Sequence, residues 1–164
     1  MASPTFKLLF VCLGNICRSP AAEGVMKQVV KDAGLADAVF IDSAGTAGWH
    51  TGKRADQRMR AAAANRGLEL TSLARQVQDR DLADFDLVLV MDRSNQADIR
   101  AFDRQGRYQD KVRLFCDFCT EHEETEVPDP YYGGAEGFEK VLDLLEDGCA
   151  GVLQRVQQRL ASSH

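Results

Sequence analysis

The residues best suited to chemistry lie together in one short segment, Cys12-Leu-Gly-Asn-Ile-Cys-Arg-Ser19. Gly14 and Asn15 are residue types that tolerate a positive φ, so the segment can curl and point its backbone N–H groups at an anion. Arg18 adds a planar guanidinium that can bind two phosphate oxygens at once. Cys12, at the centre of this field, is expected to have its pKa lowered from ~8.5 toward ~3.5–7.5 and to be a thiolate. The segment therefore predicts a nucleophile that attacks a bound phosphate ester and forms a phosphocysteine.

A purely structural interpretation of Cys12 must be weighed, because a cysteine at the end of a buried strand is usually a small core residue. The grouping of this cysteine with Gly-Asn and Arg-Ser favours catalysis. Arg18 and the N–H groups would stabilise the charge of the transition state, and Ser19 can donate a hydrogen bond to the thiolate. The segment lacks the Gly-Lys-Ser/Thr ending of a Walker loop, so it does not predict that kind of nucleotide site.

Strands that alternate with helices would position this loop. The continuous apolar run Leu8–Cys12 predicts a buried strand, and a helix is expected from about Ser19, with Pro20 in its first turn. Further apolar runs predict strands at 39–41, 86–91 and 112–115, and helices are expected at about 53–65, 94–104 and 138–160, the last with a bend near Gly148 and Gly151. This alternation predicts an α/β fold, a parallel sheet with helices on both faces, whose ligand site lies beyond the carboxyl ends of the strands.

Length, charge and cysteine count limit the class of protein. A chain of 164 residues predicts a single domain, 1–164. The net charge of −5 and the lack of a basic run argue against nucleic-acid binding and favour a small, deep anion pocket. The apolar run 8–13 is too short for a signal peptide or a membrane span. Five cysteines are typical here of free thiols in a reducing compartment, so we expect a cytoplasmic protein without membrane contact.

The motif Val11–Pro20 resembles that of the low-molecular-weight protein tyrosine phosphatase family, and the resemblance covers essentially the whole chain. Supporting segments follow in the expected order, at 42–46, 49–50, 74–76, 91–92 and 129–133. The resemblance implies a single three-layer α/β/α domain with a four-stranded parallel sheet and the phosphate-binding loop after the first strand. It also implies a monomer that needs no metal or cofactor and hydrolyses phosphotyrosine in proteins or peptides, with Cys12 as nucleophile, Arg18 as phosphate clamp and Asp129 as proton donor.

The same resemblance assigns residues to the phosphate loop and to the substrate slot. Phosphate binding and loop support are expected from Leu13, Gly14, Asn15, Ile16, Cys17, Ser19 and Ser43. The slot walls are expected to be Trp49, Tyr131 and Tyr132, which suit a flat phenyl ring. Related bacterial protein-arginine phosphatases have Thr where this chain has Ile16, which favours tyrosine. Many family members have a histidine where this chain has Ser72, and Ser72 is expected to supply part of the same hydrogen-bond support.

The chemistry of the leaving group supports Asp129 as the acid. Tyrosinate leaves poorly unless it is protonated, and a positioned acid typically contributes ~10²–10⁴-fold. Pro128 and Pro130 stiffen the loop on both sides of Asp129. After phosphocysteine has formed, the ionised carboxylate can activate water for the second step.

The remaining cysteines and histidines are interpreted more simply. Cys17 is hypothesised to capture an oxidised Cys12 as a disulfide, with a buried packing thiol as the alternative. Cys116-Asp-Phe-Cys119 with His122 resembles a metal or redox motif only superficially, because a structural zinc normally needs four ligands. Cys149 lies on an apolar helical stripe and is expected in the core, and the sequence favours a solvated His50.

Two other functions remain open. A thiol-dependent arsenate reductase shares this fold and a similar loop, but it needs further cysteines just beyond the third strand, and residues 80–98 contain none. A non-catalytic phosphotyrosine-binding module would be indicated by loss of the nucleophile or the acid. Cys12, Arg18 and Asp129 are all present, which favours the enzyme.

Overall fold

Four parallel strands form the centre of the computed structural model, which describes residues 6–131 and 133–162. The strands are β1 (Phe6–Cys12), β2 (Val39–Gly45), β3 (Leu87–Val90) and β4 (Val112–Leu114), and their order across the sheet is β2-β1-β3-β4. Cys12 lies opposite Gly45 of β2, and Val11 lies opposite Val90 of β3. The carboxyl ends of these three strands therefore meet at one edge of the sheet.

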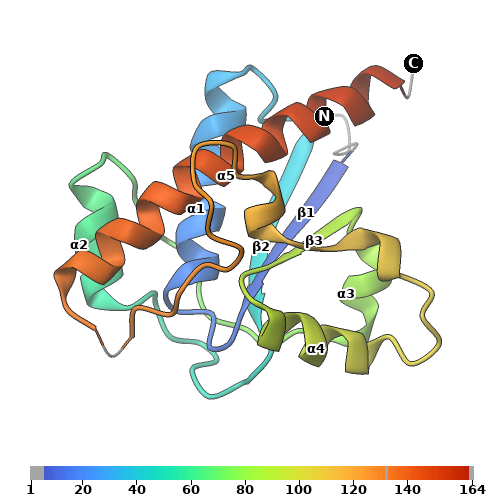
Figure 1. Ribbon diagram of the computed structural model, residues 1–164, viewed down its shortest axis with the longest axis horizontal. Helices are drawn as coiled ribbons and strands as arrows, with labels where there is room; N and C mark the ends of the chain where they lie inside the picture. The colour runs from blue at the N-terminus through green and yellow to red at the C-terminus, as the bar shows by residue number, and fades with distance from the viewer. Residues whose placement is uncertain (1–5, 132, 163–164) are drawn as a thin grey trace.

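Helices cover both faces of this sheet, as Figure 1 shows. The first face packs against α1 (Arg18–Asp32), α2 (Gln57–Ala64) and α5 (Ala135–Ser162), and the second against α3 (Asp79–Asp84) and α4 (Arg93–Phe102). Alternate residues of β1 enter the two cores, because successive side chains of a strand point to opposite faces: Leu8 and Phe10 enter one, Leu9 and Val11 the other. The predicted three-layer α/β/α fold is confirmed.

The boundaries of several elements differ from the sequence prediction. The second strand continues to Gly45, and the helix expected from 53 begins only at Gln57, where the Asp56 side chain accepts a hydrogen bond from the Arg58 N–H at 2.8 Å. Two 3-10 turns, Gln109–Lys111 (η1) and Phe115–Phe118 (η2), flank β4. The short helix α3 was not predicted, because its sequence, Asp-Arg-Asp-Leu-Ala-Asp, has too few apolar residues to show a helical pattern.

The two glycines of the last helix serve packing. The predicted long last helix is confirmed, because α5 continues as one helix through Gly148 and Gly151. A Cβ atom on Gly148 would lie 2.2 Å from Cε2 of Phe115, and one on Gly151 would lie 2.0 Å from the carbonyl oxygen of Phe118. The glycines therefore let η2 pack directly against the helix backbone. Within the part of the chain that the structure describes, no helix is both long and apolar enough to cross a membrane.

Asp147 of α5 holds the segment that follows η2. Its carboxylate accepts hydrogen bonds from the backbone N–H groups of Thr120, Glu121 and His122, each at 2.9 Å, and lies 2.7 Å from Nδ1 of His122. Burial disfavours ionisation of this carboxyl, but the hydrogen bonds outweigh burial and lower its pKa from 3.8 to about 2.

We expect Asp147→Asn to lower the free energy of unfolding at neutral pH by about 1–3 kcal/mol, since hydrogen bonds to a buried charge are lost. The Asp147 pKa is lower in the folded protein than in the unfolded chain, so its contribution is fully present above 3.8 and is lost as the pH falls through about 2. The difference in stability between wild type and variant should therefore shrink in acid. Urea unfolding at neutral pH and at about pH 2.5 measures this, and a difference that stays constant would contradict it.

Candidate active site

The predicted phosphate loop connects β1 to α1 at the sheet edge where the strands end. Its Asn15 has a φ of +57°, whereas Gly14 does not have a positive φ, so only one of the two candidate residues takes the left-handed conformation. The loop is tied to the segment after β2, because the N–H of Thr46 donates to the carbonyl of Cys12 and that of Ala47 to the carbonyl of Leu13, both at 2.9 Å. A fixed loop of this kind keeps its N–H groups oriented before any ligand arrives.

The sulfur of Cys12 is surrounded by hydrogen-bond donors. Cys12 is 3% exposed. Its Sγ lies 3.0 Å from Oγ of Ser19 and accepts the backbone N–H of Asn15 at 3.3 Å. Ser19 Oγ in turn accepts a hydrogen bond from Nδ2 of Asn15 at 2.8 Å, and the acceptors within reach of its own proton are the sulfur at 3.0 Å and the carbonyl of Ala44 at 3.5 Å. This arrangement suits a sulfur that carries negative charge.

A buried chain of side chains supports Asn15 from below. Nδ2 of Asn15 donates to Oγ of Ser43 at 3.0 Å, and its Oδ1 accepts the backbone N–H of Arg75 at 3.0 Å. The Ser43 hydroxyl then donates to Oε1 of Glu23 at 2.6 Å. Glu23 is 4% exposed, and its other oxygen pairs with Nζ of Lys27 at 2.6 Å.

The expectation that Ser72 completes this support is wrong. Among the described residues, Ser72 is half-buried and makes no hydrogen bond to the loop. The hydroxyl of Ser43 has only one proton to donate, and Glu23 takes it. Sequence analysis did not single out Glu23. The only sign of this role in the sequence is a glutamate early in the helix that follows the loop, and its burial becomes visible only in the structure.

We expect Glu23→Ala to lower kcat about tenfold, the effect of losing one hydrogen bond to a charged group that holds the loop. Glu23→Gln, which keeps an acceptor for Ser43, should stay within about threefold of wild type. Steady-state kcat and KM on an aryl phosphate measure both. Lys27→Ala is the matched control, because Lys27 is exposed and touches only the outer oxygen of Glu23. An effect of Lys27→Ala equal to that of Glu23→Ala would show that the ion pair matters and the link to Ser43 does not.

Arg18 is buried, and one of its two terminal nitrogens is held in place by protein groups. It is 2% exposed, and its Nη1 donates to Oδ2 of Asp92 at 2.7 Å and to the carbonyl of Val127 at 3.0 Å. Its Nη2 lies 3.6 Å from Oδ2 of Asp129. Burial disfavours the charge of Arg18, but the negative charges of Cys12 and Asp92 outweigh burial and raise its pKa. Nη2 therefore faces Asp129 with its position fixed from behind.

Asp92 is a site residue whose role sequence analysis missed, since it was noted only as part of a matching segment. It follows β3 directly, and because β3 lies beside β1 its carboxylate reaches the loop after β1. Its other oxygen caps α4 by accepting the N–H of Asn95 at 2.8 Å. One side chain thus fixes both the guanidinium and the start of a helix.

A cavity of about 270 Å³ opens onto this loop. It brings together most of the predicted residues, and its lining consists of Cys12, Leu13, Gly14, Ile16, Cys17, Arg18, Trp49, His50, Asp129 and Tyr131. Asn15, Ser19 and Ser43 are not among the lining residues, and the hydrogen bonds of their side chains hold the loop in place. The predicted wall residue Tyr132 lies outside the described residues. Trp49 is 71% exposed, so it borders the mouth of the cavity and is not buried in it.

His50 lies beside the loop, in the turn that follows β2. His50 is half-buried and lines the cavity, with its ring centroid 6.4 Å from that of Tyr131. Tyr131 is held from its other side by Arg58, whose guanidinium lies 5.5 Å from the Tyr131 ring centroid and donates to the Tyr131 carbonyl at 2.9 Å. Two aromatic rings and a cation therefore shape one wall of the cavity.

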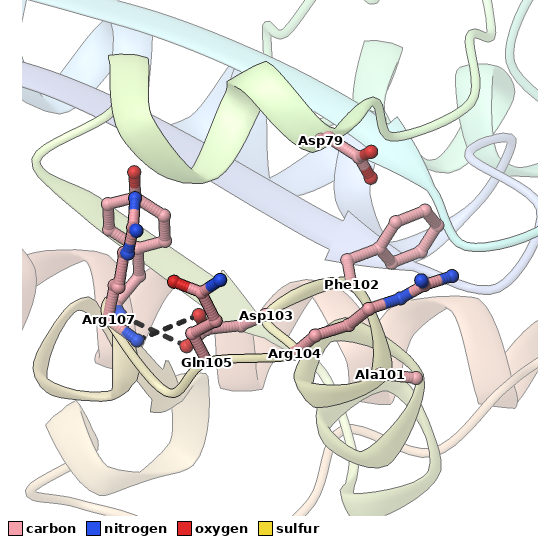
Figure 2. A pocket seen from close by; sticks show the side chains of 8 residues that line it. Asp79, Ala101, Phe102, Asp103, Arg104, Gln105 and Arg107 are labelled. Carbon is pink, nitrogen blue, oxygen red and sulfur yellow. Dashed lines mark hydrogen bonds between the residues drawn. The ribbon is translucent and has the colours of Figure 1, made fainter.

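A second, larger hollow of about 540 Å³ lies between α3 and the loop that follows α4 (Figure 2). It contains Asp79, Phe102, Arg104 and Arg107 but no cysteine. The carboxylate of Asp103 is turned to its own loop, where it accepts the backbone N–H groups of Arg107 at 2.9 Å and of Tyr108 at 3.0 Å. This hollow offers no thiol nucleophile, so the smaller cavity is the candidate active site.

Comparisons with known proteins match one family over nearly the whole chain. Residues 7–162 match the family model described as low molecular weight phosphotyrosine protein phosphatase. A low molecular weight protein-tyrosine-phosphatase of Streptomyces coelicolor is 42% identical, over 95% of this chain and 96% of its own length. A protein tyrosine phosphatase structure from Entamoeba histolytica, with Hepes in its active site, superposes with a TM-score of 0.91 at 45% identity and covers 93% of this chain and 97% of its own. The Drosophila arginine phosphatase superposes with a TM-score of 0.85 at 30% identity, covering 92% and 98%.

Proposed function

This chain belongs to the low molecular weight phosphotyrosine protein phosphatase family and is a protein tyrosine phosphatase, and from that premise we propose that Cys12, Arg18 and Asp129 carry out its two-step reaction. The observation that supports the proposal best is the cavity lined by all three side chains, although Asp129 is far from the other two in sequence. The three groups are of the types that the reaction needs: a nucleophile, a cation and an acid.

In the first step, the sulfur of Cys12 attacks phosphorus and the bond from phosphorus to the tyrosine oxygen breaks. Asp129 gives its proton to that leaving oxygen. Its side chain is 42% exposed and faces the cavity, so it can reach a substrate held at the loop. Arg18 keeps Nη2 toward the phosphoryl oxygens, because Nη1 is taken by Asp92 and Val127. The loop N–H groups bind the remaining equatorial charge.

In the second step, water attacks phosphorus and the bond from sulfur to phosphorus breaks. Asp129, now a carboxylate, takes a proton from that water as a general base. Cys12 leaves with its electron pair, and the hydrogen bonds from Ser19 and from the Asn15 N–H stabilise the sulfur as it departs. The proton taken from water leaves Asp129 protonated, so the enzyme is back in its starting state once inorganic phosphate dissociates.

The walls of the cavity support an aryl phosphate as the substrate. The apolar Ile16 and the ring of Tyr131 line the space above the loop, and Trp49 borders its mouth. Such walls favour a flat ring whose phosphate reaches the loop, while the shorter phosphoserine would place its backbone against the rim. The substrates proposed are therefore phosphotyrosine-containing proteins or peptides.

A panel of four phosphopeptides that differ only in the modified residue tests this specificity. We expect hydrolysis of the phosphotyrosine peptide, with kcat/KM about 10²-fold or more above those of the phosphoserine, phosphothreonine and phosphoarginine peptides, because only the aryl group fills the slot. Addition of a metal chelator should leave the rate unchanged. A preference for phosphoarginine, which one structural neighbour is named for, or loss of activity with chelator would overturn the proposal.

We also propose that the cavity responds to oxidants through Cys12 and Cys17, both of which line it. Hydrogen peroxide would convert the Cys12 thiolate to a sulfenic acid with release of hydroxide. Cys17 would then attack that sulfur, forming a disulfide and releasing the oxygen as water with the Cys17 proton. Burial above all raises the pKa of Cys17, so it stays a thiol until an oxidised sulfur is beside it. Irreversible oxidation of Cys12 with Cys17 left free would contradict this pairing.

The setting proposed for the enzyme follows from its composition. The cysteines of this chain are free, and an odd number of free thiols suits a reducing, cytoplasmic compartment. With a net charge of −5, the protein is proposed to act as a single domain, 1–164, and as a monomer, without nucleic-acid, membrane, metal or cofactor.

A further inference from the structure

A second pair of cysteines, one buried and one partly exposed, lies on the turn that follows β4. Cys116 belongs to η2, and Cys119 is the residue that ends it. The backbone N–H of Cys119 donates to the carbonyl of Cys116 at 3.1 Å, which closes a four-residue turn. Turns of this kind keep their first and last Cα atoms within about 7 Å, close to the range of about 4.4–6.8 Å that a disulfide spans. The backbone thus holds two free thiols at bridging distance.

The two thiols interact with each other and differ in character. Interaction with the side chain of Cys119 lowers the pKa of Cys116, and interaction with Cys116 raises the pKa of Cys119. Cys116 is almost fully buried, while Cys119 is partly exposed and has its Sγ 3.6 Å from the carbonyl oxygen of Leu144. The sulfur that ionises more readily thus has beside it a second thiol that can resolve an oxidised sulfur.

A metal site is a poorer interpretation of this pair. Over residues 6–131 and 133–162, no three His, Cys, Asp or Glu side chains converge as metal ligands. The nearby His122 points its Nδ1 at Asp147 at 2.7 Å, and Asp147 already accepts three backbone N–H groups. Two sulfurs without a third ligand suit oxidation better than metal binding.

We propose that Cys116 and Cys119 form a second redox site of this enzyme, which hydrogen peroxide converts to a disulfide independently of Cys12. The Cys116 thiolate attacks one peroxide oxygen, the O–O bond breaks, and a sulfenic acid and a hydroxide form. Cys119 then attacks the sulfenic sulfur, the S–S bond forms and the S–O bond breaks. The leaving hydroxide takes the Cys119 proton, so that two thiols and one peroxide give one disulfide and two waters.

The cysteine pair lies at the start of the segment that leads to the proposed acid, Asp129. Cys119 is followed at once by the residues that Asp147 holds, and the same segment continues to Val127, whose carbonyl anchors Arg18, and to Asp129. Phe118, between the two cysteines, packs on the backbone of α5 at Gly151. The disulfide would therefore fix the turn from which the segment carrying the proposed acid departs.

Peptide mapping of the wild-type enzyme tests the proposal directly. Trypsin cleaves after Lys7 and Arg18 and after Arg113 and Lys140, so peptide 8–18 carries Cys12 and Cys17 and peptide 114–140 carries Cys116 and Cys119. After treatment with hydrogen peroxide, denaturation and alkylation, we expect peptide 114–140 to be unalkylated and lighter by two hydrogen atoms. Treatment with dithiothreitol should restore two alkylatable thiols. Cys149, fully buried in the core, is the internal control and should alkylate after denaturation throughout.

Variants decide whether the pair acts by itself. Cys12→Ser should give the same disulfide in peptide 114–140, because the proposal does not involve the active-site sulfur. In Cys119→Ser, Cys116 should instead remain alkylatable or be oxidised to the sulfinic or sulfonic acid. Two alkylated cysteines in peptide 114–140, at a peroxide dose that fully oxidises Cys12, would overturn the proposal, and so would loss of the disulfide in Cys12→Ser.

Discussion

Replacing Cys12 by serine is expected to lower kcat by about 10⁴–10⁶-fold, the range found when a covalent nucleophile is removed. Serine fits the site, since its hydroxyl can take the hydrogen bonds from Ser19 and from the Asn15 N–H. A hydroxyl is not ionised at neutral pH, however, and its hydrogen-bond partners among the described residues, Ser19 and the Asn15 N–H, are not general bases. Rates with p-nitrophenyl phosphate and with a phosphotyrosine peptide measure the loss.

Binding should survive the same substitution. The loop N–H groups and Arg18 remain, so the dissociation constant of inorganic phosphate should change by less than about tenfold, measured by calorimetry. Cys119→Ser is the matched control, because Cys119 lies outside the cavity and should keep the wild-type rate. Equal rates for wild type and Cys12→Ser would mean that the protein binds phosphotyrosine without turning it over through this sulfur.

The loop and the sheet could be predicted from the sequence because both depend on local patterns. An apolar run followed by Gly-Asn marks the end of a buried strand, and alternating strands and helices restrict the sheet to a parallel form. Cys12, Arg18 and the neighbouring N–H groups belong to one turn, so their proximity follows from the chain itself. The Asp129 loop could not be placed in this way, and only the family resemblance brought it to the site.

The residues that sequence analysis missed are those that reach the site from elsewhere in the fold. Asp92 meets Arg18 because β3 lies next to β1, and strand order cannot be determined from apolar runs alone. Glu23 meets Ser43 because one face of α1 packs on β2, which depends on the rotation of that helix. The glycines of α5 show the same limit: flexibility and close packing predict the same residue type, and only the approach of Phe115 decides between them.

The electrostatics of the site explain how an acidic protein can hold a phosphate. The charge of Arg18 is largely balanced by Asp92, at 2.7 Å from Nη1, and Asp129 lies close to Nη2. The guanidinium therefore supplies directed N–H groups more than net positive charge. The rest of the attraction must come from the loop amides and from the amino end of α1, which begins at Arg18. A bound phosphate would also be repelled by an ionised Asp129, so productive binding favours the protonated acid that the first step requires.

Replacing Asp129 by asparagine is expected to lower kcat/KM for a phosphotyrosine peptide by about 10²–10⁴-fold, the usual contribution of a positioned acid. The loss should be much smaller for p-nitrophenyl phosphate, because nitrophenolate leaves without being protonated. Across a series of aryl phosphates, kcat/KM should therefore depend more steeply on leaving-group pKa in Asp129→Asn than in wild type. Asp79→Asn, the same change in the other hollow, should leave this dependence unaltered. A loss equal for every leaving group would assign Asp129 to positioning Arg18, whose Nη2 lies 3.6 Å from its carboxylate. The dependence of kcat/KM on leaving-group pKa, more than the size of the loss, therefore decides whether this side chain transfers a proton.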